Sequence, residues 1–218
     1  MDMVLDNTEV RILGCLIEKE MTTPEYYPLS LNALMNACNQ KSSRNPVVSY
    51  DETTITQGID SLHGKKLVQR TLTAGSRVQK YLHAFLDMFD LSRQELAVLC
   101  DLMLRGPQTI GEIRSHTERM AAFESLEEVE QTLRGLMEHD PALVMILPRE
   151  PGRKESRYIH FLSAGSYAES RTSELPNEQT VRLSERITSM EEEVMRLRIE
   201  IDGLKQAFSE FKSQESAQ

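Results

Sequence analysis

The sequence predicts a mainly α-helical protein with small β-hairpins (the α+β class), arranged as two tandem winged-helix domains followed by a C-terminal coiled-coil helix. Three observations predict this class. The order helix, helix, helix, hairpin occurs twice, residues recur in the two hairpins at one fixed offset, and apolar residues near the C-terminus keep a heptad spacing. We therefore expect domain 1 at residues 1–90, domain 2 at 91–164, a linker at 165–177 and a coiled-coil helix at 178–213.

Domain 1 is predicted from four apolar patterns. Segments 7–20 and 30–40 carry apolar residues at helical spacing, the second behind a capping serine. A third helix is expected after Asp51, and its inner face carries Ile55, Ile59 and Leu62. Segment 67–85 reads as two strands joined by a Gly-containing turn. Three helices and a hairpin in this order are typical of a winged helix-turn-helix.

Domain 2 repeats this order. Helices are expected at 94–106, 109–117 and 125–139, and two strands joined by a Pro-Gly turn follow at 142–162. The hairpins align at an offset of 77 residues, which pairs Gly75 with Gly152, Tyr81 with Tyr158 and His83 with His160. The recurrence of a histidine at matching positions indicates a structural role for both imidazoles.

The C-terminal segment predicts a parallel homodimer. Its apolar residues alternate spacings of four and three and would form the dimer interface: Leu183, Ile187, Met190, Val194, Leu197, Ile201, Leu204, Phe208 and Phe211. β-branched residues recur at one core position and mainly leucine at the other, which favours two parallel strands. The flanking residues that would meet across such a dimer are opposite in sign. The alternative is that this helix folds back on its own chain.

Charge and composition limit the possible environments. The chain of 218 residues has a formal net charge of −9, which argues against broad nucleic-acid binding. Residues 37–86 are the exception, with seven basic and three acidic side chains. The three cysteines are far apart, no apolar run of membrane-spanning length occurs, and no signal peptide is recognised. We expect a cytoplasmic protein that does not enter membranes.

The basic region predicts a DNA-binding surface on domain 1. In a winged helix, the third helix enters the major groove while the hairpin follows the backbone. The candidate nucleic-acid-binding residues are Lys41, Arg44, Thr53, Gln57, Ser61, Lys65, Lys66, Arg70, Arg77 and Lys80. Asp60 on the same face counts against this interpretation, because a carboxylate repels phosphates. The alternative is that these charges only solvate the surface.

The third helix of domain 2 differs from its counterpart. Its outward residues are predicted to be Glu127, Gln131, Arg134 and Glu138. This acidic surface should repel a phosphate backbone, so domain 2 is expected to pack against its neighbouring domain or to contact a protein partner instead.

The stretch ACNQKSSRNP, residues 37–46, resembles an active site in composition but lies between two predicted helices. Cys38 completes the apolar face of the preceding helix and is expected in the core. Lys41 and Arg44 have the reach to contact phosphates, whereas the amides and hydroxyls are equally suited to folding the loop on itself. The sequence therefore predicts either a recognition element or a specialised turn.

Residues 9–47 resemble the YceH-like family of uncharacterised bacterial proteins. The matching segments are EVRILG, IEK, TTPE, YPLSLN, ACNQKSSR and PV, and the likeness continues through LRGPQT and ESRYIH, over residues 4–164 in all. The resemblance implies tandem winged-helix domains and implies no activity and no catalytic residues. The C-terminal helix is a departure, because family members often end near the second wing.

The motifs of common enzymes are missing from the sequence. It has no Gly-rich phosphate loop, no HExxH and no GxSxG, and its five histidines are scattered without metal-ligand spacing. We predict a non-enzymatic protein without cofactors, most simply a dimeric DNA-binding transcriptional regulator. The alternative is an adaptor that binds proteins and no DNA.

Overall fold

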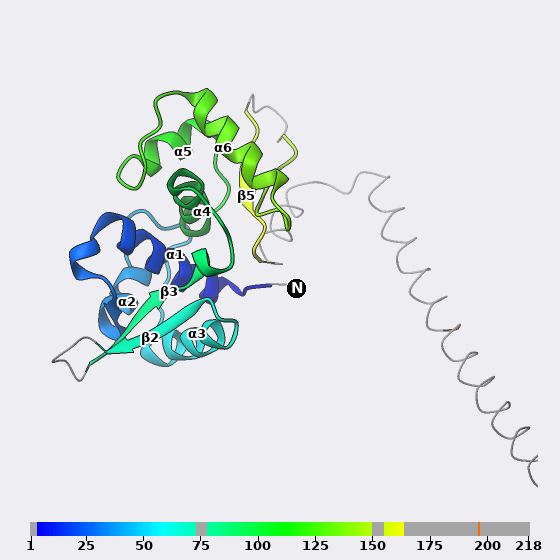
Figure 1. The fold of residues 1–218 in the computed structure, drawn as a ribbon. Helices are drawn as coiled ribbons and strands as arrows, with labels where there is room; N and C mark the ends of the chain where they lie inside the picture. The colour runs from blue at the N-terminus through cyan, green and yellow to red at the C-terminus, as the bar shows by residue number, and fades with distance from the viewer. Residues whose placement is uncertain (1–3, 73–77, 150–154, 164–195, 197–218) are drawn as a thin grey trace, which may run out of the picture. The chain divides into compact units, whose positions relative to one another are not determined.

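The computed structural model describes residues 4–72, 78–149 and 155–163, together with residue 196. Within these ranges the chain forms six α-helices, two short 3-10 helices and two small antiparallel sheets (Figure 1). The predicted α+β class, mainly helical with small hairpins, is confirmed. No helix in the described part of the chain is both long and apolar enough to cross a bilayer.

The first repeat holds a three-stranded sheet in the order β1–β3–β2. Its elements are α1 (Asn7–Thr22), η1 (Pro24–Tyr26), β1 (Leu29–Ser30), α2 (Leu31–Cys38), α3 (Glu52–Gly64), β2 (Val68–Leu72) and β3 (Gln79–His83). Each α-helix begins after a side chain that accepts a hydrogen bond from the first turn, namely Asp6, Ser30 or Asp51. These caps satisfy backbone N–H groups that the helix leaves unpaired.

The second repeat follows the 3-10 helix η2 (Phe85–Asp87) and keeps the same order. It contains α4 (Arg93–Arg105), α5 (Ile110–Thr117), α6 (Leu126–Glu138), β4 (Val144–Ile146) and β5 (Tyr158–His160). Leu29 pairs with Tyr81 in the first sheet, and in the second an isolated bridge joins Gln108 to Tyr158. Strand β1 of the first repeat therefore corresponds, in the described part of the second repeat, to a single isolated bridge at Gln108.

The two recurring histidines have the same structural role, as their positions predicted. The Nδ1 atom of His83 accepts a hydrogen bond from the backbone N–H of Phe85 at 3.3 Å. The Nδ1 atom of His160 accepts the equivalent bond from Leu162 at 3.4 Å. Both imidazoles therefore fix the chain where it leaves the last strand of its repeat.

Helices α1 and α4 lie side by side at the centre of the core. Every residue from Glu9 to Ile17 is buried, and so is every residue from Leu96 to Leu104. A Cβ atom added at Gly14 would lie 2.9 Å from a methyl carbon of Leu104, so the two helices approach each other closely there. Both repeats consequently belong to one compact unit, residues 1–171.

The predicted linker and coiled coil concern residues that the structure does not describe. The linker at 165–177 and all nine heptad residues, from Leu183 to Phe211, lie outside the described residues. The same holds for Arg77. The coiled coil therefore stays a prediction.

Candidate functional site

The outer face of α3 has the polar surface that the sequence predicted. Ile55, Ile59 and Leu62 have exposures of 0%, 1% and 0%, so one side of the helix is fixed in the core. Thr53, Gln57 and Ser61 are exposed. Figure 1 shows α3 at the outside of the first repeat, next to β2, which it contacts. The Thr53 hydroxyl and the Gln57 amide on this face are available to an external partner, whereas the Ser61 hydroxyl interacts with Glu9.

Three of the predicted phosphate-binding cations are unpaired. Lys41 and Lys66 are exposed, Lys80 is half-buried, and none of these lysines forms an ion pair with another described residue. Lys66 follows α3 in the left-handed conformation, with φ of 62°. The backbone N–H groups of Lys66 and Leu67 donate to His63 and Leu62, and this tight turn places Lys66 at the helix end.

Two other predicted cations are held by carboxylates. The Nζ atom of Lys65 lies 2.6 Å from both carboxylate oxygens of Glu9, which is 1% exposed. Burial opposes ionisation of Glu9, but the bonds from Lys65, Ser61 and the backbone of Asp6 together outweigh it, and the pKa of Glu9 is lowered. Arg70 is paired with Asp60 on α3. Asp60 therefore neutralises a neighbouring cation, and the positive surface of the hairpin is smaller than the sequence suggested.

Arg44 has a structural position rather than a place on the surface. Its side chain is fully buried, and its guanidinium donates to both carboxylate oxygens of Glu18, at 2.9 and 2.5 Å. It also donates to the backbone carbonyl of Ala37 at 3.2 Å. Although burial disfavours both charges, the mutual hydrogen bonds lower the pKa of Glu18 and raise that of Arg44. The prediction that Arg44 reaches a phosphate backbone is not supported by this geometry.

The loop between α2 and α3 is a specialised turn. The Asn39 side chain donates to the carbonyl of Tyr50 and accepts from its N–H, both at 2.8 Å, which closes the loop. Arg11, which belongs to α1, donates to the backbone carbonyls of Cys38 and Pro46. The Asn45 N–H donates to the carbonyl of Leu104 at the end of α4. The polar residues of this stretch therefore shape its backbone, and Cys38 is buried in the core as predicted.

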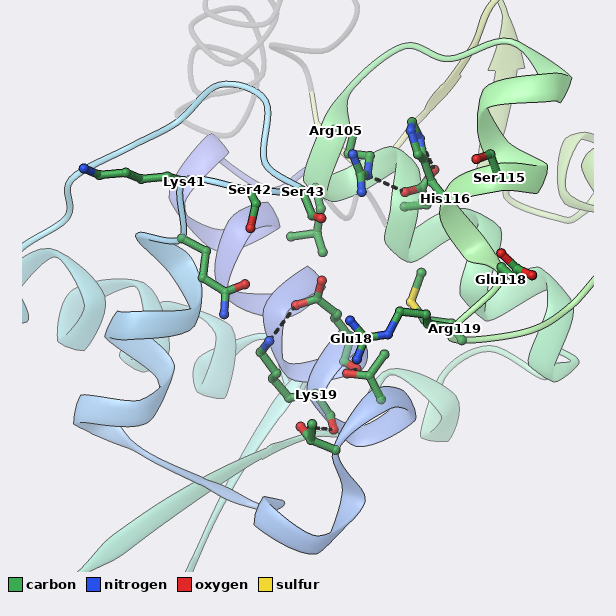
Figure 2. A pocket seen from close by; sticks show the side chains of 16 residues that line it. Glu18, Lys19, Lys41, Ser42, Ser43, Arg105, Ser115, His116, Glu118 and Arg119 are labelled. Carbon is green, nitrogen blue, oxygen red and sulfur yellow. Dashed lines mark hydrogen bonds and ion pairs between the residues drawn. The ribbon is translucent and has the colours of Figure 1, made fainter.

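A polar pocket with a volume of about 720 Å³ lies where this loop meets the second repeat (Figure 2). Its walls are the end of α1, residues 40–43 of the loop, the end of α4 and the end of α5. Figure 2 shows Ser42 and Ser43 on the loop side and Arg105 and His116 on the opposite side. Segments far apart in the sequence form this pocket, so no local motif could have revealed it.

Asp101 is the buried acid of the pocket. It is 2% exposed and accepts hydrogen bonds from Gln108 at 2.6 Å and from Arg105 at 3.0 Å. The other end of the Gln108 amide lies 2.5 Å from a ring nitrogen of His116. Burial raises the pKa of Asp101 to about 7, although the bonds from Gln108 and Arg105 oppose the rise. In the sequence, the one indication that Asp101 is buried is its position within the apolar run LAVLCDLML.

The outward face of α6 is acidic, as predicted. Glu127, Gln131, Arg134 and Glu138 are exposed, and Glu130 adds a further exposed carboxylate. The opposite face packs inward through Val129, Leu133 and Leu136, each 0% exposed. Within the described residues, no cluster of three or more potential ligands could hold a metal ion.

Fold and sites together define a mainly helical protein with two repeated units, a polar surface on α3 and a polar pocket between the repeats. The chain belongs to the family described as "Protein of unknown function, DUF480", whose model matches residues 5–153. This supports the resemblance to a family of uncharacterised proteins.

Several relatives share most of the chain. A UPF0502 protein of Pelobacter propionicus is 51% identical over 220 residues, which cover 95% of this chain and 100% of that protein. A UPF0502 protein of Geotalea daltonii is 50% identical and covers 98% of this chain and 99% of its own length. One of Citrifermentans bemidjiense is 56% identical over 165 residues, 75% of each chain. The longer alignments extend into the C-terminal segment, so this segment is not a departure from these relatives.

The pH dependence of the stability of an Asp101→Asn variant tests whether the pKa of Asp101 is raised in the folded chain. The folded pKa of about 7 lies above the unfolded value of about 3.9, so the folded chain binds the proton more tightly. As the pH rises between these values, the wild type should lose stability relative to Asp101→Asn, by at most about 1.4 kcal/mol per pH unit. Urea denaturation at a series of pH values measures this difference. Asp90→Asn, at an exposed position, controls for the lost charge, and parallel curves for the wild type and Asp101→Asn would contradict the account.

Proposed function

We propose that the chain is a non-enzymatic, homodimeric DNA-binding protein, a transcriptional regulator whose two repeats are winged-helix domains. The first repeat contacts the duplex through α3 and the β2–β3 hairpin. The second repeat contacts another protein. The assignment rests on geometry and sequence together, because the family description names no activity.

The observation that carries the proposal is the exposed polar face of α3 beside the hairpin. The order α1, β1, α2, α3, β2, β3 with a β1–β3–β2 sheet is the arrangement expected of a winged helix. In that arrangement α3 is the helix that enters the major groove. Its exposed Gln57 has the amide that pairs with adenine, and the hydroxyls of Thr53 and Ser61 suit bases or phosphates.

The number of phosphate contacts is small in this proposal. Lys41, Lys66 and Lys80 have no carboxylate partner among the described residues, whereas Lys65 and Arg70 do. A paired cation adds little attraction for phosphate because its field is largely cancelled nearby. One copy of the first repeat would then bind DNA weakly and with a modest dependence on salt.

Dimerisation compensates for weak single contacts. The heptad residues between Leu183 and Phe211 join two chains and so present two DNA-binding repeats at once. Sedimentation equilibrium tests this step. The full chain should sediment as a dimer and a chain ending at residue 177 as a monomer, whereas a monomeric full chain would contradict the proposal.

A protein-binding adaptor is the second candidate, and the acidic outer face of α6 favours it. Three carboxylates and one arginine are exposed there, which repels nucleic acid and suits a basic protein partner. The two candidates differ in one property, since only the first requires binding to duplex DNA.

Salt dependence of binding to random duplex DNA tests the first candidate. The three lysines that have no ion-pair partner among the described residues predict that the logarithm of the binding constant falls with the logarithm of salt, and they contribute a slope of about −3 per chain. Lys66→Asn removes one cation, and asparagine tolerates the left-handed conformation at this position. The slope should therefore become shallower by about 1. Fluorescence anisotropy of labelled DNA measures both slopes.

The matched control is Arg134→Gln, which removes one positive charge from the exposed face of α6. Its slope and affinity should equal those of the wild type. If the full chain does not bind DNA at low salt, or if Lys66→Asn and Arg134→Gln behave alike, the DNA-binding proposal fails and the adaptor takes its place.

A further inference from the structure

We infer that the pocket between the loop and the second repeat is a binding site for a small, non-aromatic molecule bearing phosphate groups. This inference goes beyond DNA binding, because no residue of α3 lines the pocket; of the candidate DNA-contacting residues, Lys41 is the one that also lines it. A volume of about 720 Å³ lies within the range of small-molecule sites, about 300–1,000 Å³.

The floor of the pocket consists of two fixed charge networks. Glu18 is held by the buried guanidinium of Arg44 and lies 3.3 Å from Lys19. Asp101 is held by Arg105 and Gln108. Because the half-buried Glu18 and the buried Asp101 already have their own partners, neither presents an unpaired carboxylate that would repel an anion. Binding would then require little rearrangement of these groups.

Arg119 is the cation best placed to receive a ligand. It lines the pocket, is exposed, and has no ion pair or hydrogen bond with another described residue. Figure 2 shows its side chain extending from the end of α5 toward α1, while the Glu118 carboxylate lies at the edge. Lys41 stands at the rim on the opposite side, pointing away from the centre. The guanidinium fork suits two oxygens of one phosphate group.

Serine hydroxyls complete the donor set. Ser42 and Ser43 on the loop and Ser115 on α5 line the pocket, and their hydroxyls are without a hydrogen-bond partner among the described residues. Four basic and three acidic residues line the pocket, and Arg44 behind Glu18 adds a further positive charge. The pocket is thus locally positive in a chain with a net charge of −9, and it attracts anions.

The residues that line the pocket also indicate that its ligand has no nucleobase. Among the described residues no phenylalanine, tyrosine or tryptophan lines the pocket, and the His116 imidazole is the one ring they offer for stacking of a nucleobase. In the described lining, Leu104 and Met120 are the two large apolar side chains. Polar walls with arginine, lysine and hydroxyl donors favour a compact polyanion over a nucleotide.

Isothermal titration of the full-length protein with inorganic pyrophosphate, at constant ionic strength, tests this inference. The wild type should bind with saturation at one site per chain. Arg119→Gln should weaken binding by about tenfold or more, because it removes a charge-assisted hydrogen bond. Arg134→Gln removes an equal formal charge at an exposed residue that does not line the pocket and should leave the affinity unchanged.

Thermal unfolding of both variants establishes that each is folded before titration. Absence of saturable binding by the wild type would overturn the inference. So would equal affinity of the wild type and Arg119→Gln, or an equal loss in the two variants, since the latter would indicate attraction by net charge alone.

Discussion

The ion pair between Arg44 and Glu18 is the interaction on which the loop and the pocket both depend. The side chain of Arg44 is fully buried. Its hydrogen bonds to the two carboxylate oxygens of Glu18, 2.9 and 2.5 Å long, join the loop to α1. Loss of one partner would leave a charge buried without compensation, which typically costs about 3–5 kcal/mol. Arg44 also donates to the backbone carbonyl of Ser43 at 2.8 Å and to the side chain of Gln40 at 3.1 Å, and residues 40–43 form one wall of the pocket.

Local sequence patterns predicted the elements well because helix periodicity, caps and turn residues act over a few residues. The inner and outer faces of α3 and α6 are where the spacing of Ile55, Leu62 and Leu133 placed them. For α1 the same reasoning predicted one buried face, yet the helix is buried on all sides, because α4 covers the face that the first repeat leaves open. A periodic pattern shows that a face is buried but not which partner covers it.

Charged residues were the least predictable part of the candidate site. Arg44 and Lys41 read alike in sequence as loop cations, but Arg44 is paired with Glu18 and Lys41 is exposed. The pairing of Lys65 with Glu9 likewise joins residues 56 positions apart. Ion pairs of this kind depend on the packing of whole helices, so sequence overstated the basic surface and gave no sign of the pocket.

A double-mutant cycle between Arg44 and Glu18 tests the central claim most directly. Free energies of unfolding would be measured by urea denaturation for the wild type, Arg44→Met, Glu18→Gln and the double variant. The account predicts a coupling energy of about 2–3 kcal/mol, with the double variant less destabilised than the sum of the single changes. Additive effects within about 0.5 kcal/mol would show that the two side chains act independently and would contradict the account.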